Sequence, residues 1–261
     1  MMNLIALPAF ADNYIWMLHD GARAVVVDPG DAAPVRAALD AHGLKLAGIL
    51  VTHHHPDHVG GIADLRPQLQ GPVFGPAREK VPCPFTPLND GDDIQVIGLH
   101  FKVLDVPGHT AGHIAYIQQG EAMPGIAAPL LFCGDTLFSA GCGRLFEGTP
   151  GQMFDSLARL AALPAETQVC CTHEYTLSNL RFAAAVEPGN AERAAFELRC
   201  RELRAADLPT LPSSIGRERQ INPFLRCDAP EVVAAARAQG ATSNAPVAVF
   251  TTLREWKNRF R

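Results

Sequence analysis

The sequence lacks several features that would mark whole classes of protein. It has no run of Lys or Arg and a net charge of −5, which argues against a nucleic-acid partner because such sites need clustered cations. No apolar stretch approaches the length that spans a bilayer. The first residues, MMNLIALPAFADNY, have no basic opening, and Pro8 interrupts their apolar run, so no secretory signal is predicted. We expect a cytoplasmic protein without nucleic-acid or membrane partners, with a monomer as the default state.

No C-x-x-C pair occurs among the seven cysteines, and their number is odd. Free thiols in a reducing compartment fit this pattern better than a disulfide framework. With 261 residues, the chain can bury a large core without such crosslinks.

The first two thirds of the chain contain short apolar segments that are rich in β-branched or aromatic residues, which is typical of strands. They occupy residues 14–31 (two strands joined at Asp20-Gly21), 46–52, 99–106, 113–119, 129–134 and 167–172. Helices are predicted at 33–43, where Gly43 ends the pattern, and at 152–164, where Met153, Phe154, Leu157 and Leu160 form one stripe.

After about residue 173 the sequence becomes Ala-rich and helical in pattern. Helices are predicted within 177–186, 190–206, 229–240 and 246–260, with Asn190 and Asp228 as starts and Gly240 as a stop. Residues 207–226 lack periodicity and are expected to form a functional or disordered loop. We predict an α/β domain over residues 1–173 and a smaller α-helical domain over 174–261.

Four of the ten histidines crowd into THHHPDH, directly after the predicted strand at 46–52. In an extended stretch alternate side chains point the same way, so His53, His55 and Asp57 can share one side while His54 faces the other. His58 follows where the chain should turn. Because two histidines cannot complete a metal site, further ligands are expected elsewhere.

Three more candidate ligands each follow a predicted strand: His109, Asp135 and His173. Strand ends gathered at one rim would bring them to the histidine cluster. The ligand count then fits two divalent metal ions. His53, His55 and His109 serve the first ion, Asp57, His58 and His173 serve the second, and Asp135 bridges the two.

A pair of metal ions indicates hydrolytic chemistry. Two cations clamp a hydroxide that attacks a carbonyl group, and they stabilise the resulting oxyanion. Asp57 and Asp135 are the expected catalytic carboxylates, with Asp57 orienting the hydroxide. His and Asp ligands suit zinc first, with iron or manganese as alternatives. His54 and His113 are left over from the ligand count, and we interpret them as supporting or packing residues.

The ligand pattern resembles the metallo-β-lactamase superfamily, whose H-x-H-x-D-H motif THHHPDH matches. The resemblance implies an αββα sandwich, with two facing β-sheets between outer helices. It leaves the substrate open, because members of the superfamily cut lactams, lactones, thioesters and phosphodiesters.

Four other segments are similar to glyoxalase II, the hydroxyacylglutathione hydrolases: CGDTLFSAGCGRLFEGTPGQM, THEYTLSNLRFA, INPFLR and LREWKNRF. The resemblance runs from about residue 3 to the C-terminus. It implies hydrolysis of S-D-lactoylglutathione, and of related 2-hydroxyacylglutathiones, to glutathione and a hydroxy acid such as D-lactate, in methylglyoxal degradation. It also implies that the substrate is bound by Arg144, Phe146, Tyr175, Arg254 and Lys257. Phe146 stands where many relatives have Tyr, and Asn258 where Asp is frequent.

The sequence leaves two alternatives open. One is another enzyme of the superfamily, either a persulfide dioxygenase, which uses one iron and generally lacks the helical domain, or a lactonase, which should not need the three cations. The other is a non-catalytic metal-binding protein, although such members typically lose some of the ligands.

Overall fold

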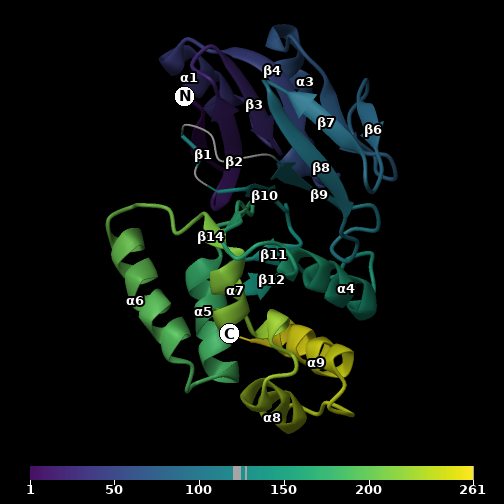
Figure 1. Cartoon of the computed structure of the whole chain (residues 1–261), viewed down its shortest axis with the longest axis vertical. Helices are drawn as coiled ribbons and strands as arrows, with labels where there is room; N and C mark the ends of the chain where they lie inside the picture. The colour runs from purple at the N-terminus through teal and green to yellow at the C-terminus, as the bar shows by residue number, and fades with distance from the viewer. Residues whose placement is uncertain (120–124, 127, 261) are drawn as a thin grey trace. The chain divides into compact units, whose positions relative to one another are not determined.

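The computed structural model describes residues 1–119, 125–126 and 128–260, and it contains two compact units (Figure 1). Unit 1 comprises Met1–Asp105, Ala111–Gly134 and Cys170–His173. Unit 2 comprises Val106–Thr110, Asp135–Val169 and Glu174–Arg261. Within the described part of the chain, no helix has the length and apolar character needed to cross a membrane.

Unit 1 begins with a six-stranded sheet in the order β1-β2-β3-β4-β5-β6. Its strands are β1 Asn3–Ala9, β2 Asn13–His19, β3 Arg23–Val27, β4 Lys45–Leu50, β5 Val73–Pro76 and β6 Thr86–Leu88. β1, β2 and β3 pair antiparallel, whereas the pairs from β3 to β6 are parallel. The predicted turn at Asp20-Gly21 is confirmed, since the Asp20 carboxylate accepts hydrogen bonds from the backbone N–H of Ala22 and of Arg23.

The second sheet of unit 1 is antiparallel and runs in the order β10-β9-β8-β7. Its strands are β7 Asp93–Val96, β8 Leu99–Asp105, β9 Ile114–Gln119 and β10 Leu130–Phe132. The two sheets face each other closely. A Cβ atom added to Gly48 of β4 would lie 2.8 Å from the Val96 side chain of β7, and the Tyr116 hydroxyl of β9 donates to the Val51 carbonyl at 2.9 Å.

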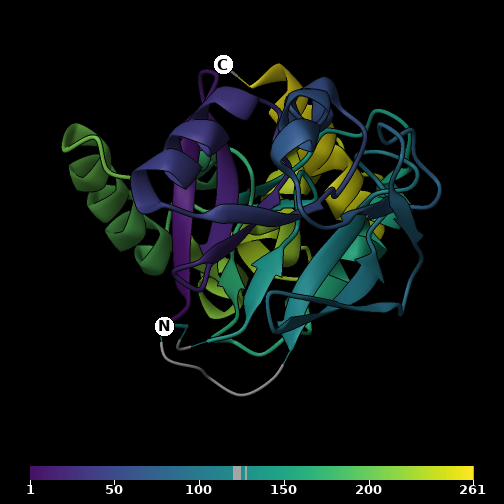
Figure 2. The same ribbon diagram turned by 90° about the horizontal axis from the view of Figure 1, so that it is seen from above.

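Helices cover the other face of the first sheet (Figure 2). They are α1 Ala32–His42, α2 Pro56–Val59 and α3 Ile62–Leu65, followed by the short 3-10 helix η1 Arg66–Gln68. Val35 of α1 and Ile62 of α3 pack with Val26 and Ile49 of the sheet in one buried cluster. Asp31 caps the start of α1, and Gly43 ends it with φ of 64°, as predicted. A helix layer on a pair of facing sheets confirms the predicted sandwich architecture.

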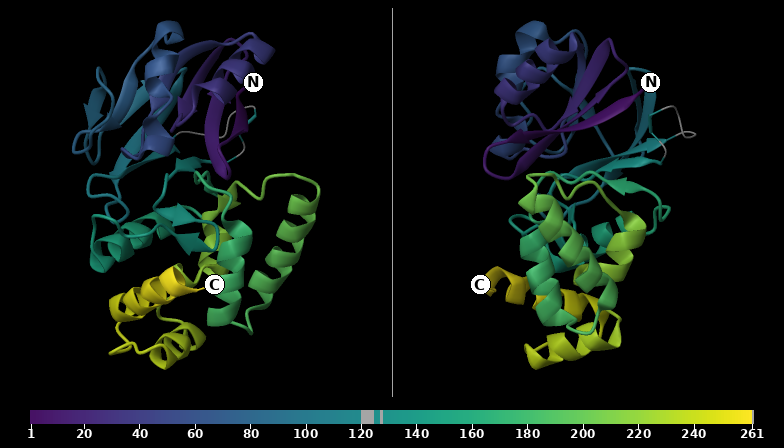
Figure 3. Two further views of the ribbon diagram at one scale, coloured as in Figure 1. Left: turned by 180° about the vertical axis from the view of Figure 1, so that it is seen from behind. Right: turned by 90° about the vertical axis from the view of Figure 1, so that its left-hand side faces the viewer.

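Unit 2 is mainly helical (Figure 3). Its helices are α4 Pro150–Ala161, α5 Thr176–Val186, α6 Ala191–Ala205, α7 Ile215–Ile221, α8 Pro230–Ala238 and α9 Pro246–Arg259, with the 3-10 helix η2 Pro223–Leu225. Two short antiparallel pairs accompany them: β11 Leu137–Phe138 with β12 Gly141–Cys142, and β13 Gln168–Val169 with β14 Ser213–Ser214. Asn190 caps α6 as predicted. The prediction of Asp228 as a helix start was one residue early, because Ala229 is the N-cap of α8 and Pro230 its first residue.

Residues 207–226 are not a loop. They contain β14, α7 and η2, and the Ser214 side chain caps α7 by accepting from the Arg217 N–H. Helix α7 has only seven residues, which is too few for a helical period to stand out in the sequence. The prediction failed because the element is short and is held by tertiary contacts.

Candidate metal centre

Each cluster of predicted ligands follows a strand, as expected from the sequence. His53 and His55 follow β4, His109 follows β8, Asp135 follows β10, and His173 follows β13. The local geometry at Asp57 differs from the prediction. Pro56 starts helix α2 directly after His55, so Asp57 and His58 lie on a helical turn and not on an extended stretch.

The first group of ligands lies wholly in unit 1 and consists of Asp57, His58 and His173. Asp57 Oδ2 is 3.5 Å from Nε2 of His58 and 3.5 Å from Nε2 of His173. The three donor atoms lie within 4.8 Å of one another, which is close enough for one ion to contact all three. Both histidines are buried, whereas the Asp57 side chain is 40% exposed, so this group has an open side.

Carboxylate groups lie within hydrogen-bond distance of the Nδ1 atoms of these two histidines. His58 Nδ1 lies 3.1 Å from Asp28 Oδ2, and His173 Nδ1 lies 2.8 Å from Asp12 Oδ1. A carboxylate partner on Nδ1 leaves Nε2 as the ligating nitrogen and fixes the direction of the ring. Asp12 and Asp28 were missed by the sequence analysis. The signal for Asp28 was present, because it directly follows β3 in the way the ligands follow their strands.

His53 and His55 form a second pair in unit 1, with His53 Nε2 3.1 Å from His55 Nδ1. His53 is fully buried, and its Nδ1 lies 3.1 Å from the Thr52 hydroxyl. His54 points elsewhere: its backbone N–H and its Nδ1 both meet Glu79 Oε2 at 2.7 Å. These contacts direct His54 towards Glu79, and its assignment as a supporting or packing residue stays a prediction.

The loop that follows β3 lies very close to the backbone of helix α2. A Cβ atom at Gly30 would lie 1.9 Å from the Asp57 carbonyl oxygen, and one at Gly61 would lie 2.7 Å from the Pro29 carbonyl oxygen. The loop after β3 therefore contacts the backbone of α2 directly, without intervening side chains. This contact sets the position of Asp57 and His58.

In unit 2, His109 and Asp135 lie together, with His109 Nε2 3.4 Å from Asp135 Oδ2. His109 Nδ1 lies 2.8 Å from the Arg144 carbonyl, so Nε2 is again the nitrogen left for a ligand. A Cβ atom at Gly143 would lie 1.9 Å from the Asp135 carbonyl oxygen. Residues 143–144 thus contact the backbone of one predicted ligand and the side chain of the other.

Two of the predicted substrate residues, Arg144 and Phe146, lie on this same segment and are exposed. The Phe146 ring stands edge-on to the His109 ring at 5.3 Å. Its backbone N–H donates to the His109 carbonyl at 3.2 Å. That N–H therefore contacts His109, whereas the Phe146 side chain is exposed.

Arg254 and Lys257 lie one turn apart on α9, but their environments differ. Arg254 is 4% exposed, and it donates from Nη1 to the Cys142 carbonyl at 2.8 Å and from Nη2 to Asn258 Oδ1 at 3.1 Å. Lys257 Nζ donates to the Ser178 carbonyl at 3.2 Å. Burial, followed by the positive charge of Arg254, lowers the pKa of Lys257 to about 8. Arg254 thus joins α9 to β12, and Lys257 is the more accessible cation.

Tyr175, the remaining predicted substrate residue, is the N-cap of α5 and is half-buried. Its ring stands edge-on to Phe138 of β11 at 5.3 Å. This contact joins α5 to the β11–β12 hairpin, whose neighbouring residues are Asp135 and Arg144.

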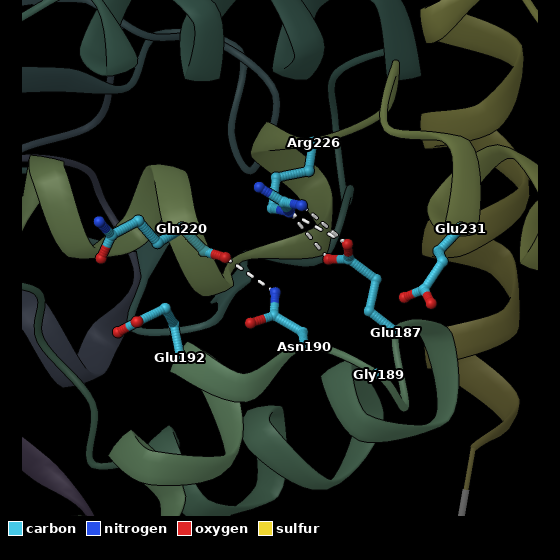
Figure 4. Close-up of a pocket in the computed structure, with 7 residues that line it drawn as sticks. All are labelled: Glu187, Gly189, Asn190, Glu192, Gln220, Arg226 and Glu231. Atoms are coloured by element: carbon cyan, nitrogen blue, oxygen red, sulfur yellow. Dashed lines mark hydrogen bonds and ion pairs between the residues drawn. The ribbon is translucent and has the colours of Figure 1, made fainter.

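Unit 2 also has a pocket of about 410 Å³ that is separate from the predicted site residues (Figure 4). It is lined by Glu187, Gly189, Asn190, Glu192, Gln220, Arg226 and Glu231. The Arg226 guanidinium donates to both oxygens of the buried Glu187 carboxylate, and the Asn190 amide donates to the Gln220 carbonyl. Arg226 of INPFLR is therefore paired with Glu187, while Glu192 and Glu231 also line the pocket.

The donor chemistry of the ligand groups fits divalent metal ions. Imidazole Nε2 atoms together with carboxylate oxygens are ligands suited to zinc, iron or manganese. In each group, Nδ1 of a histidine lies within hydrogen-bond distance of an oxygen atom. This is the usual arrangement for an imidazole that binds a metal through Nε2.

Comparisons with known families agree with this geometry. Residues 10–173 match the family model described as Metallo-beta-lactamase superfamily, and residues 174–260 match the model described as Hydroxyacylglutathione hydrolase C-terminus. Together with the two facing sheets and the histidine–aspartate clusters, these matches define a metal-dependent hydrolase of the metallo-β-lactamase superfamily.

Relatives that match over their full length identify the family within this superfamily. A hydroxyacylglutathione hydrolase from Albidiferax ferrireducens is 58% identical over 259 residues, which cover 99% of this chain and all of the relative. One from Pseudomonas aeruginosa is 57% identical over 265 residues, with complete coverage of both chains. The chain therefore belongs to the hydroxyacylglutathione hydrolase family, also called glyoxalase II.

Solved structures support the same fold. The crystal structure of ETHE1 from Myxococcus xanthus matches with a TM-score of 0.63 and 24% identity, covering the whole of both chains. That of TTHA1623 in a di-iron-bound form matches with a TM-score of 0.58 and 28% identity, covering 85% of this chain and 99% of that one.

Proposed function

We propose that the protein hydrolyses the thioester of S-D-lactoylglutathione, and of related 2-hydroxyacylglutathiones, to glutathione and the free hydroxy acid. The observation that carries this proposal is the 58% identity, over 99% of the chain, to a hydroxyacylglutathione hydrolase. The chemistry of the two ligand groups agrees with it, because a thioester hydrolase of this superfamily needs a metal-activated nucleophile. In the cell this activity removes the glutathione adduct formed during methylglyoxal degradation.

All seven predicted ligands serve one dinuclear centre in this proposal: His53, His55, Asp57, His58, His109, Asp135 and His173. When bound, the two ions lower the pKa of water and supply a hydroxide nucleophile at neutral pH. The chain contributes the orientation of the ligands, through Asp28 on His58, Asp12 on His173 and the Arg144 carbonyl on His109. Zinc is the first choice of metal, and iron is supported by the di-iron form of TTHA1623.

Arg144, Phe146, Tyr175, Arg254 and Lys257 bind the glutathione part of the substrate. Glutathione ends in a carboxylate, which suits lysine and arginine donors. Arg254 uses two N–H groups in the contacts described above, and a guanidinium has five, so others remain for a ligand. Phe146 offers ring contact where a tyrosine would also offer a hydroxyl.

We also propose a domain organisation, an oligomeric state and a cellular location for the protein. Residues 1–173 form the catalytic domain and residues 174–261 the helical substrate-binding domain, a division supported by the ranges of the two family models. The protein acts as a monomer in the cytoplasm, without nucleic-acid or membrane partners, which agrees with its acidic net charge of −5.

Steady-state hydrolysis of S-D-lactoylglutathione, measured beside the elemental metal content, tests the function. The expected result is turnover together with about two bound ions per chain, both lost on exhaustive chelation. Metal-replete protein that is inert towards glutathione thioesters would contradict the proposal. So would oxygen consumption with glutathione persulfide, which is the mark of a persulfide dioxygenase.

Lys257 gives this function a characteristic pH dependence. Its pKa of about 8 lies below the usual 10.5, so the ammonium is charged below pH 8 and becomes neutral above it. The groups that influence it are Arg254, Cys142, Arg181 and Arg144. If Lys257 binds the substrate carboxylate, KM should rise roughly tenfold between pH 7 and pH 9, because the protonated fraction falls.

The matched control is Lys257→Arg, because arginine keeps its charge throughout this range. Its KM should change less with pH than that of the wild-type protein, while both share any effect of pH on the substrate and the metal centre. An identical KM–pH curve for the two proteins would remove Lys257 from the binding site.

A further inference from the structure

The segment ADNYIW, at the start of β2, lies along the chain that carries His173. The Tyr14 N–H donates to the Thr172 carbonyl at 2.6 Å, and the Trp16 indole N–H donates to the Cys171 carbonyl at 2.9 Å. Asn13 and His173 form an isolated antiparallel bridge. These contacts lie wholly in unit 1, and they place the side chains of residues 12 and 13 beside the ligand group of Asp57, His58 and His173.

Those two side chains each reach a different predicted ligand. Asp12 Oδ1 lies 2.8 Å from His173 Nδ1, and Asn13 Nδ2 donates to Asp57 Oδ2 at 3.0 Å. Asn13 is 6% exposed, so its amide is shielded from competing water. The oxygen that Asn13 contacts is the same Oδ2 that faces Nε2 of both His58 and His173.

This geometry constrains one ligand group and not the other. The amide of Asn13 limits rotation of the Asp57 carboxylate, and Asp12 sets the plane of the His173 ring. Among the described residues, the side chains of Asp12 and Asn13 make these contacts with His173 and Asp57, and not with His53 or His55. Hydrogen-bond partners of this kind typically change metal affinity by about 10–100-fold.

We infer that Asp12 and Asn13 are positioning residues for the metal ion bound by Asp57, His58 and His173, and that they tune the affinity of this ion independently of the other one. The inference rests on the proposed metal-dependent function. A purely structural role would be different: the backbone contacts of Tyr14 and Trp16 would then suffice to join the strands, and residues 12 and 13 would only add stability.

Metal titration of the full-length protein separates these roles. The metal-free wild-type protein and the variants Asn13→Ala and Asp12→Asn are titrated with Zn²⁺ against a competing chelator, and with Co²⁺ to follow the ligand-field spectrum. Asn3→Ala, at a half-buried position of β1, and Asp40→Asn, at an exposed position of α1, serve as matched controls. Asp12→Asn preserves size, so it guards against failure of the alanine variant to fold.

The expected result is that one of the two dissociation constants rises by about 10–100-fold in each variant, while the other stays within about twofold. The melting temperature of the metal-free protein should remain that of the controls. The inference would be overturned if both dissociation constants stayed unchanged. It would also be overturned by an equal loss of metal affinity at both sites, accompanied by a lower melting temperature of the metal-free protein. The wild-type protein tests the proposed function separately, through its two bound ions and its thioester turnover.

Discussion

Replacing Asp135 by alanine is expected to abolish turnover and to deplete bound metal. In the proposed centre this carboxylate is the bridge between the two ions, and it lies 3.4 Å from Nε2 of His109. Its loss removes a ligand from both ions together, so kcat should fall by a factor of ~10³ or more. Steady-state kinetics and elemental analysis of the purified variant measure the two effects.

Asp155 on α4 provides the matched control, because it is an exposed aspartate of the same unit. Asp155→Ala should retain wild-type turnover and metal content. If Asp135→Ala kept both as well, Asp135 would not be a bridging ligand, and the assignment of the centre would have to change.

Replacing Glu218 by alanine is expected to destabilise the protein strongly. Glu218 is fully buried in α7, and its carboxylate accepts hydrogen bonds from the Ser139 hydroxyl, the Ala140 N–H, the Ser213 hydroxyl and the Asn222 amide. Burial raises the pKa of this carboxyl group, and the four donors oppose that shift. Leaving several buried donors unsatisfied should lower the free energy of unfolding by about 3 kcal/mol or more.

Urea unfolding of Glu218→Ala beside Glu202→Ala measures this effect, since Glu202 is an exposed glutamate on helix α6. If the free energy of unfolding fell no further in Glu218→Ala than in the control, the four donors would have found other partners. Among molecules that remain folded, the β11–β12 hairpin between Asp135 and Arg144 should be the part that loosens, because Ser139 and Ala140 lie in its turn. An increase in KM with this variant would report that loosening.

The sequence predicted those elements that have a clear hydrophobic pattern or a recognisable cap or stop residue at one end. The strands at 46–52 and 99–106, the helix stop at Gly43 and the cap at Asn190 are all present. Strand β1 was missed because Pro8 in its apolar run suggested an interruption, and an edge strand of a sheet tolerates proline. Helix α7 was missed because a buried glutamate and short length obscure its pattern.

The candidate site was predictable as a set of residue types but not as a set of contacts. Four ligand clusters after four strands are visible in the sequence, because metal ligands are rare and specific residue types. The residues that orient them are not visible in that way. Asp12, Asn13 and Glu79 are ordinary polar residues, and only the folded chain brings them to His173, Asp57 and His54. Arg254 was predicted only as a substrate-binding cation, and it is the structure that shows it buried against the Cys142 carbonyl.

The bare backbone contact between Gly30 and Asp57 has a consequence for protein engineering. Any side chain at position 30 would have to displace helix α2, because a Cβ atom there would lie 1.9 Å from the Asp57 carbonyl oxygen. Random libraries that vary residue 30 should therefore yield few metal-loaded clones. Attempts to recruit a new substrate would have more freedom at Phe146, whose side chain is exposed.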